Sequence, residues 1–255
     1  MVAQHPRDYS NINDTMTADL NAESSAELTR RHETVLERIR KAARSAGRDP
    51  ATVGLLAVNK GHSARAIDAL HRLGQRDFGE SYLQEALPKL DEMSGRNLNW
   101  HFIGPLQRNK CRAIATRFDW VHSLDRPDLA ERLARLRPQH LPPLQICLQV
   151  KLSAEVQKSG AQPEDLPILA ETVAGLPQLR LRGLMTIPEA SIDPSAQRAV
   201  YARLRALLEQ LRAAGHELDT LSMGMSGDLE AAILEGSTLV RIGTALFGRR
   251  FVART

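Results

Sequence analysis

The sequence predicts an α/β fold, a single (β/α)8 barrel of the TIM type, in which eight parallel strands alternate with helices. The length of 255 residues suits one large domain of this kind. Apolar segments typical of buried strands recur about every 20 to 30 residues, with helical patterns between them. The segment 220–248 reads as strand, small-residue turn, helix, strand and small-residue turn, which is typical of phosphate sites after strands seven and eight. An open doubly wound sheet is the alternative fold.

The composition is that of a soluble globular protein, with 42% hydrophobic and 25% charged residues. No apolar run approaches the ~20 residues of a membrane span. The N-terminus lacks the apolar core of a secretory signal, so we expect a cytoplasmic protein. The net charge of +4 comes from basic residues interleaved with acidic ones, and only two Trp, three Tyr and five Phe could stack on bases. We therefore expect no nucleic-acid or membrane partner. Cys111 and Cys147 stand apart and should only pack.

The N-terminal region adds a helix to the basic barrel plan. Residues 1–22 are polar and aperiodic, which predicts a disordered tail, and residues 23–255 are expected to form the single barrel domain. Ser24 and Glu27 have the spacing of a capping box. We expect a helix from there to Ala46, closed by Gly47.

The strands and helices of the barrel follow in strict alternation. We expect strands at residues 53–58, around Phe78, and at 100–103, 120–124, 144–150, 181–187, 220–224 and 239–242. We expect helices after Ser63, through Leu90, through about Thr116, after Asp125, up to Gly175, after Asp193, and from Leu229 with Gly236 at its C-terminal cap.

The active face of such a barrel lies at the carboxyl ends of its strands. The residues expected there are Asn59, Lys60, Glu80, Gly104, Lys151, Pro188, Ser226, Gly243 and Thr244. Ser226 and Thr244 add hydroxyl groups to the glycine-containing turns, where backbone N–H groups can approach an anion. The segment 220–248 is therefore predicted to bind a phosphate.

Lys60 directly follows a wholly apolar strand. Desolvation and neighbouring positive charge would favour its neutral amine, which could form a Schiff base. The alternative is a lysine whose stem packs while its amine reaches solvent. His62, His101 and His122 lie near strands without metal-ligand spacing, so no metal site is expected.

Several motifs together resemble the pyridoxal phosphate homeostasis proteins, the YggS/PROSC family that binds pyridoxal 5'-phosphate (PLP). They cover roughly residues 53 to 248 in order, and WHFIGPLQRNK and the C-terminal segment are the most specific. The motifs are AVNKGHS at 57–63, GESYLQE at 79–85, WHFIGPLQRNK at 100–110, KSG at 158–160, GLMTIP at 183–188 and LSMGMSGDLEAAILEGSTLVRIGTALFG at 221–248.

The resemblance implies a barrel like the N-terminal domain of alanine racemase, with PLP held by Lys60 as an internal aldimine. Ser226, Gly243 and Thr244 match positions around the phosphate, and Arg241 matches the arginine that faces the pyridine nitrogen. A purely structural ion pair is the alternative for Arg241. The predicted cofactor-binding set is Lys60, Asn59, Met223, Ser226, Arg241, Gly243 and Thr244, with no catalytic residue and no metal.

The implied role is PLP (vitamin B6) homeostasis with no or negligible catalysis, with transfer of PLP to apo PLP-enzymes as a family expectation. Because no second domain is expected, we expect a monomer. A permanently cationic Arg241 disfavours a protonated ring nitrogen and so weakens the electron sink. The main alternative is a small PLP-dependent amino-acid racemase, for which Tyr82 or Tyr201 would have to be the second base. An aldolase-like Schiff-base barrel without PLP is a third interpretation.

Three positions depart from the family pattern. Asn59 replaces a serine, Ser81 replaces an asparagine, and Lys151 replaces another asparagine. We expect Asn59 and Ser81 to exchange hydrogen-bonding roles. Lys158 is a possible second site for the PLP aldehyde, and the alternative is a solvated loop lysine.

Overall fold

The computed structural model describes residues 10–152 and 159–248, with side chains from residue 25 onward. Eight strands form a closed barrel in the order β1 to β8, and every neighbouring pair, including β1 with β8, is parallel. The predicted (β/α)8 barrel is therefore confirmed, and the open sheet is excluded. The strands are β1 (Gly54–Val58), β2 (Asp77–Glu80), β3 (Asn99–Phe102), β4 (Trp120–Leu124), β5 (Leu144–Gln149), β6 (Leu179–Met185), β7 (Thr220–Ser222) and β8 (Leu239–Ile242).

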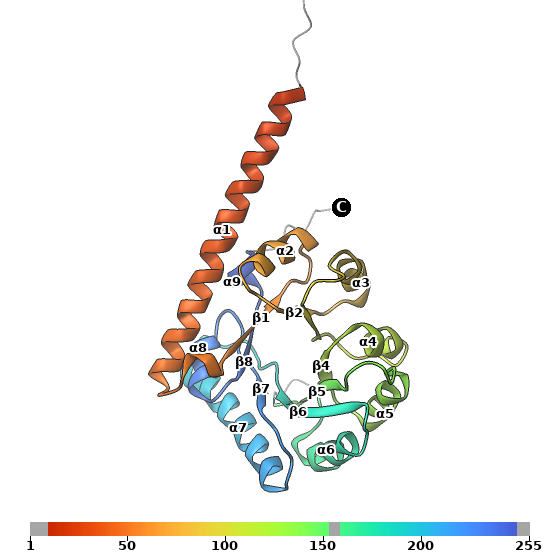
Figure 1. The fold of residues 1–255 in the computed structure, drawn as a ribbon. Helices are drawn as coiled ribbons and strands as arrows, with labels where there is room; N and C mark the ends of the chain where they lie inside the picture. The colour runs from red at the N-terminus through yellow and green to blue at the C-terminus, as the bar shows by residue number, and fades with distance from the viewer. Residues whose placement is uncertain (1–9, 153–158, 249–255) are drawn as a thin grey trace, which may run out of the picture.

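Helices surround the strands on the outside of the barrel (Figure 1). They are α1 (Ser10–Ser45), α2 (Ala64–Arg72), α3 (Leu83–Glu92), α4 (Cys111–Arg117), α5 (Pro127–Leu136), α6 (Leu166–Ala174), α7 (Pro194–Ala213), α8 (Leu229–Leu234) and α9 (Thr244–Phe247), with short 3-10 turns at Pro50–Thr52 and Pro163–Asp165. This ring of helices buries the outer face of the strands and leaves the strand ends accessible to carry a site.

Successive residues of a strand point to opposite sides of the barrel wall. On β8, Val240 and Ile242 are fully buried in the hydrophobic core between strands and helices. Arg241 lies between them and is bound instead to groups that end β6 and β7. The alternation along β8 thus places Arg241 inside the barrel.

The N-terminal helix is longer than the sequence pattern predicts. It begins at Ser10, so the expected start near Ser24 is wrong, and residues 10–22 of the expected disordered tail belong to α1. Because residues 10–24 contain no glycine or proline, nothing in them interrupts a helix. The first part of α1 extends away from the barrel (Figure 1), and residues 1–9 lie outside the described residues.

The later part of α1 packs against the barrel. Val35, Ile39, Ala42 and Ala43 are buried, and α1 contacts α2, α8 and α9. Burial of this apolar stripe stabilises the docked helix. The added helix therefore covers the part of the barrel where β7, β8 and β1 meet.

The helix caps agree in part with the sequence. Asp193 caps α7, because its carboxylate accepts hydrogen bonds from the backbone N–H groups of Ser195 (3.0 Å) and Ala196 (3.3 Å). Gly236 follows α8 with φ of +96°, as expected of a C-terminal glycine. The cap expected at Asp125 is wrong: α5 begins at Pro127, whose fixed φ suits a first helical position, and its cap residue is Arg126.

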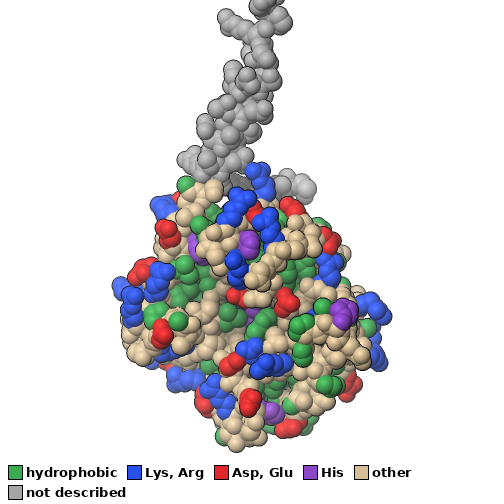
Figure 2. Space-filling model, in the orientation of Figure 1, with side chains coloured by type: hydrophobic (Ala, Val, Ile, Leu, Met, Phe, Trp, Pro, Cys, Tyr) green, Lys and Arg blue, Asp and Glu red, His purple; other side chains and the backbone are tan. Residues whose placement is uncertain are grey.

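Basic and acidic side chains are interspersed over the surface seen in Figure 2. Many of them pair, such as Arg182 with Asp219. Among the described residues, none of the helices combines the length and the apolar character that crossing a bilayer requires.

Candidate functional site

The ends of β1 and β8 lie side by side at the carboxyl face of the barrel. The register pairs Leu56 with Arg241 and Ala57 with Ile242. Asn59 and Lys60 therefore leave β1 next to Gly243 and Thr244, which leave β8. The structure thus brings the predicted Schiff-base lysine to the predicted phosphate-binding turn, and the Lys60 side chain is half-buried there.

The turns after β7 and β8 are joined by a hydrogen bond. The backbone N–H of Ala245 donates to Ser226 Oγ at 3.2 Å. The Ser226 turn is fixed from the other side by Asp228, whose carboxylate accepts from the backbone N–H of Met225. Ser226, Gly243 and the exposed Thr244 are thereby held together in one small group.

Two glycines allow the close backbone approach at these turns. Gly224 has φ of +94°, and a Cβ there would lie 2.6 Å from Ala232 Cβ. A Cβ at Gly243 would lie 3.2 Å from the Val58 carbonyl oxygen. Without these side chains, the strands β1, β7 and β8 end close together around the turns.

Asn59 belongs to a buried polar cluster at the end of β1. It is fully buried, and its Nδ2 donates to Glu80 Oε1 at 2.5 Å. Lys89 Nζ donates to the same oxygen at 2.6 Å and to the Asn59 carbonyl at 3.0 Å. Burial raises the pKa of Glu80, while Lys89 opposes that shift. This cluster fixes the backbone immediately before Lys60.

Lys89 is a site residue that the sequence reasoning missed. It lies on α3 and has the sequence context of a solvated helix face. Its contact with Glu80 depends on the packing of α3 over the ends of β1 and β2, which local sequence does not encode. Asn59 was predicted to contact the cofactor, and in the structure its Nδ2 donates to Glu80.

Arg241 is buried and has no carboxylate in direct contact among the described residues. Its guanidinium donates to the Ser222 carbonyl and to Ser222 Oγ (3.0 Å) from Nη1, and to the Thr186 carbonyl (2.9 Å) from Nη2. Burial lowers the pKa of Arg241, although Tyr201 and Asp228 oppose that shift. These contacts set the orientation of the guanidinium inside the barrel.

Met223 behaves differently from the rest of the predicted set. It is fully buried and packs in the hydrophobic core between strands and helices. Its carbonyl accepts a hydrogen bond from Ser237 Oγ at 2.7 Å. Its side chain therefore supports the turn from behind and does not join Lys60 and Ser226 at the strand ends.

The remaining candidates from the sequence are two lysines and two tyrosines. Lys151 follows β5 and is half-buried, while Lys158 lies outside the described residues. Tyr82 is 50% exposed at the start of α3. Tyr201 is fully buried on α7, its hydroxyl donates to Asp228 Oδ2 at 2.8 Å, and burial with the nearby Asp228 raises its pKa.

Arg38 of α1 is a second residue that sequence reasoning missed. Its Nη2 donates to the Ser226 carbonyl at 3.1 Å, and its guanidinium pairs with Glu230 of α8 at 2.7 and 2.8 Å. The N-terminal helix thus holds the turn after β7 directly. A charged residue in a long polar helix gives no local signal of this contact.

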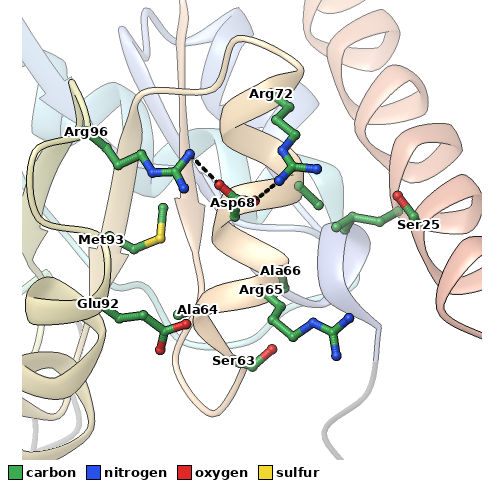
Figure 3. A pocket seen from close by; sticks show the side chains of 12 residues that line it. Ser25, Ser63, Ala64, Arg65, Ala66, Asp68, Arg72, Glu92, Met93 and Arg96 are labelled. Atoms are coloured by element: carbon green, nitrogen blue, oxygen red, sulfur yellow. Dashed lines mark ion pairs between the residues drawn. The ribbon is translucent and has the colours of Figure 1, made fainter. Parts of the chain in front are cut away.

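A cavity of about 610 Å³ lies elsewhere, between α1, α2 and the end of α3 on the outer side of the helices (Figure 3). Arg72 and Arg96 on its wall both pair with Asp68. Its lining includes none of the predicted cofactor-binding residues. The strand ends described above are therefore the better candidate site.

Comparisons with known proteins agree with this fold. Residues 31–250 match the family described as alanine racemase, N-terminal domain. Alanine racemase from Corynebacterium glutamicum shares the fold, with a TM-score of 0.62 and 17% identity over 88% of this chain and 63% of its own. Fold and family match together define the class of this protein as an alanine racemase N-terminal-domain barrel.

Higher identities narrow that class. The pyridoxal phosphate homeostasis protein of Pseudomonas aeruginosa is 62% identical over 216 residues, which cover 85% of this chain and 93% of the relative. That of Escherichia coli is 48% identical over 219 residues, covering 85% and 94%. PipY of Synechococcus elongatus, solved with PLP bound, is 39% identical with a TM-score of 0.73, over 84% of this chain and 100% of PipY. The chain belongs to the pyridoxal phosphate homeostasis protein family, and the predicted resemblance is confirmed.

Proposed function

We propose that this protein binds PLP at the carboxyl ends of its barrel strands and serves PLP homeostasis with no or negligible turnover. The observation that carries the proposal is the meeting of Lys60, after β1, with the joined turns after β7 and β8. The names of the curated relatives and the PLP in PipY support it.

The residues at the strand ends fit a phosphorylated aldehyde. Gly243 and Gly224 keep the turns free of side chains that would collide with neighbouring groups. Asn59 Oδ1 and Glu80 Oε2 are buried polar atoms without a hydrogen-bond partner among the described residues, and Asn59 adjoins Lys60. Buried polar atoms without a hydrogen-bond partner are rare in protein interiors, and they occur where a ligand or a water molecule supplies the missing hydrogen bond.

Each residue has a distinct part in the proposed complex. The amine of Lys60 would hold the aldehyde carbon as a Schiff base, while Ser226, Gly243 and Thr244 would bind the phosphate. Arg241 would face the ring nitrogen. When bound, PLP supplies an aldehyde that reacts with amines and a ring that accepts electrons.

The surroundings of the site favour a carrier over a racemase. Arg241 is a fixed cation, which disfavours a proton on the ring nitrogen. A racemase of this type needs a second base opposite the lysine. The Tyr201 hydroxyl donates to Asp228 and its pKa is raised by burial, so it stays protonated at neutral pH and is not available as a base. Tyr82, the other tyrosine considered as the second base, is half-exposed at the start of α3.

The proposal extends to partners and location. We propose a cytoplasmic monomer that supplies PLP to apo PLP-enzymes. Light scattering of the PLP-loaded protein should give the mass of one chain. Mixing the loaded protein with an apo PLP-enzyme should restore the activity of that enzyme, and no restoration would contradict the transfer role.

The test of the proposed function is a spectroscopic titration with PLP. The wild type should develop the visible absorption band of a Schiff base, and Lys60→Ala should not, because only the wild type has the amine. Lys41→Ala, which changes an exposed lysine of α1, is the matched control and should behave as the wild type.

The same loaded protein should be incubated with each enantiomer of alanine. Conversion no faster than in a protein-free PLP control supports the carrier role. Conversion that exceeds this background and is lost in Lys60→Ala would instead establish a racemase. Absence of a visible band in the wild type would contradict PLP binding itself.

A further inference from the structure

A continuous line of hydrogen bonds crosses the interior of the barrel and ends on Arg241. At its far end, Asp77 Oδ1 lies 3.1 Å from His101 Nε2. His101 Nδ1 lies 2.9 Å from His122 Nε2, and His122 Nδ1 lies 2.9 Å from Ser222 Oγ. Ser222 Oγ accepts from Arg241 Nη1 at 3.0 Å. Four strands besides β8 contribute one residue each, so this line joins segments far apart in the sequence.

The line runs from the amino end of the barrel to its buried centre. Asp77 is the first residue of β2, and its side chain is 35% exposed, whereas that of His101 is 2% exposed. His122 and Ser222 are fully buried. The His101 ring is stacked on Trp120 with centroids 5.2 Å apart, and Arg182 covers the Trp120 ring. These neighbours leave the histidines little freedom to turn.

The polarity of the line follows from its two ends. Arg241 can only donate, so Ser222 Oγ must accept from it. Burial alone would raise the pKa of Asp77, but its hydrogen bonds with His101 and Asn99 lower it, so Asp77 is a carboxylate that only accepts. His101 must therefore carry a proton on Nε2.

The middle of the line is fixed by the hydroxyl of Ser222. Burial holds the pKa of His122 well below its usual range, so His122 is neutral. Because Ser222 Oγ accepts from Arg241, we assign its own proton to the bond with His122 Nδ1, and the neutral His122 then donates from Nε2 to His101 Nδ1. Every bond then donates in one direction, from Arg241 toward Asp77.

We propose that Asp77, His101, His122 and Ser222 form a relay that positions Arg241 and offsets its positive charge from the opposite end of the barrel. Arg241 has no carboxylate in direct contact among the described residues. Asp228 acts on it only through space, and the polarised hydrogen bonds of this line connect it to Asp77. The relay acts on the cofactor only through Arg241, and in this respect it rests on the proposed function. The four residues are positioning residues.

The first test needs no cofactor. Nitrogen-15 NMR of the PLP-free protein reports which ring nitrogen of each histidine carries a proton. The relay predicts neutral rings with the proton on Nε2 in both His101 and His122 at neutral pH. A proton on Nδ1 of either ring would reverse or break the line and overturn the proposal.

The second test follows Arg241 itself. Ser222→Ala removes the hydroxyl that joins Arg241 to His122, and Asp77→Asn removes the terminal charge while keeping an acceptor. Both should shift the Arg241 guanidinium signals. In titrations with PLP, both should weaken binding by about two- to tenfold, the range for one hydrogen bond that is lost in Ser222→Ala and weakened in Asp77→Asn, and both should move the visible band in the same direction.

Asp49→Asn is the matched control. Asp49 is exposed, lies before β1 at the same end of the barrel and also loses one charge, but it accepts only from the backbone N–H of Ala51, which Asn can replace. It should leave the Arg241 signals and PLP affinity within twofold of the wild type. Equal effects of Asp49→Asn and Asp77→Asn would overturn the relay and indicate only long-range charge. A wild type that binds no PLP would contradict the proposed function, while the NMR signals would still decide on the relay.

Discussion

Glu80 is fully buried, and the positive charge that compensates its carboxylate comes from Lys89. The Glu80 side chain has no exposed surface and that of Lys89 is 12% exposed, with 2.6 Å between Nζ and Oε1. Removal of one partner of such a pair leaves an uncompensated charge, which costs more than the pair contributes.

Lys89→Met should therefore destabilise the protein by about 3 kcal/mol at neutral pH, the lower end of the range for a broken buried pair. The pKa of Glu80 is already raised above 4.5 by burial, and loss of Lys89 raises it further. A carboxyl group whose pKa is raised in the folded state stabilises the protein at pH values below its ordinary pKa. This stabilisation is lost as the pH rises through the folded-state pKa. The cost should thus be smaller near pH 5 than near pH 8.

Urea unfolding at both pH values checks this prediction. Lys41→Met, at an exposed position of α1, is the control and should cost little at either pH. A Lys89→Met cost that does not change with pH would contradict the assignment of the charge to Glu80.

Gly224 is required at the turn after β7 for two reasons, its positive φ and its contact with α8. Gly224→Ala should cost about 1–3 kcal/mol more than Gly215→Ala, because Gly215 has a similar φ of +99° but open space around its Cα. Gly224→Ala should also weaken PLP binding, since it displaces the Ser226 turn. Thermal unfolding and PLP titration of both variants measure these effects, and equal stability losses would refute the packing argument.

The sequence allows prediction of those residues of the candidate site whose positions follow from strand ends. Lys60, Ser226, Gly243 and Thr244 could be grouped because parallel strands of a barrel end on one face. The supporting contacts of Lys89 and Asn59 could not be predicted, because they depend on how α3 lies over two strands. For His101 and His122 the sequence indicated only that they lack metal-ligand spacing. Their hydrogen bonds could not be predicted, because they join different strands of the barrel.

At the scale of the elements, α1 is more than an added covering of the barrel. Through Arg38 it holds the Ser226 carbonyl and Glu230 of α8. The helix therefore braces the turn that we propose to bind phosphate.

Arg38→Met should weaken the binding of PLP about two- to tenfold, because the turn loses one hydrogen bond that fixes it. The stability change should stay below about 1 kcal/mol, since the ion pair with Glu230 is partly exposed. Arg40→Met, which removes only an exposed pair with Glu37, should leave PLP affinity unchanged. Calorimetric titration with PLP measures the affinity of both variants. Unchanged affinity in Arg38→Met would contradict a role of α1 in PLP binding.

Element boundaries show where sequence patterns stop being informative. β4 and β8 begin and end as predicted, because each has apolar residues at both ends and is bounded by polar or glycine residues. β7 ends at Ser222, two residues before the prediction, because the positive φ of Gly224 turns the chain. The start of α1 was missed because a polar segment of helix-compatible residues resembles a disordered one in composition.

At the scale of the whole molecule, the closed barrel could be predicted from the eightfold repetition of strand and helix in the sequence. Eight strand–helix units can bury all their apolar faces by closing, and the structure joins β1 to β8 as that argument requires. The interior polar line from Asp77 to Arg241 is also a property of closure, since it connects strands from both halves of the chain.

The central claim, that Lys60 holds PLP covalently, is tested most directly by trapping the bond. The protein should be loaded with PLP, reduced with borohydride, digested and mapped by mass spectrometry. We predict a stoichiometric pyridoxyl modification on the peptide that contains Lys60, and none on Lys151, Lys158 or Lys89. A modification found mainly on another lysine, or none above that of a denatured control, would contradict the account.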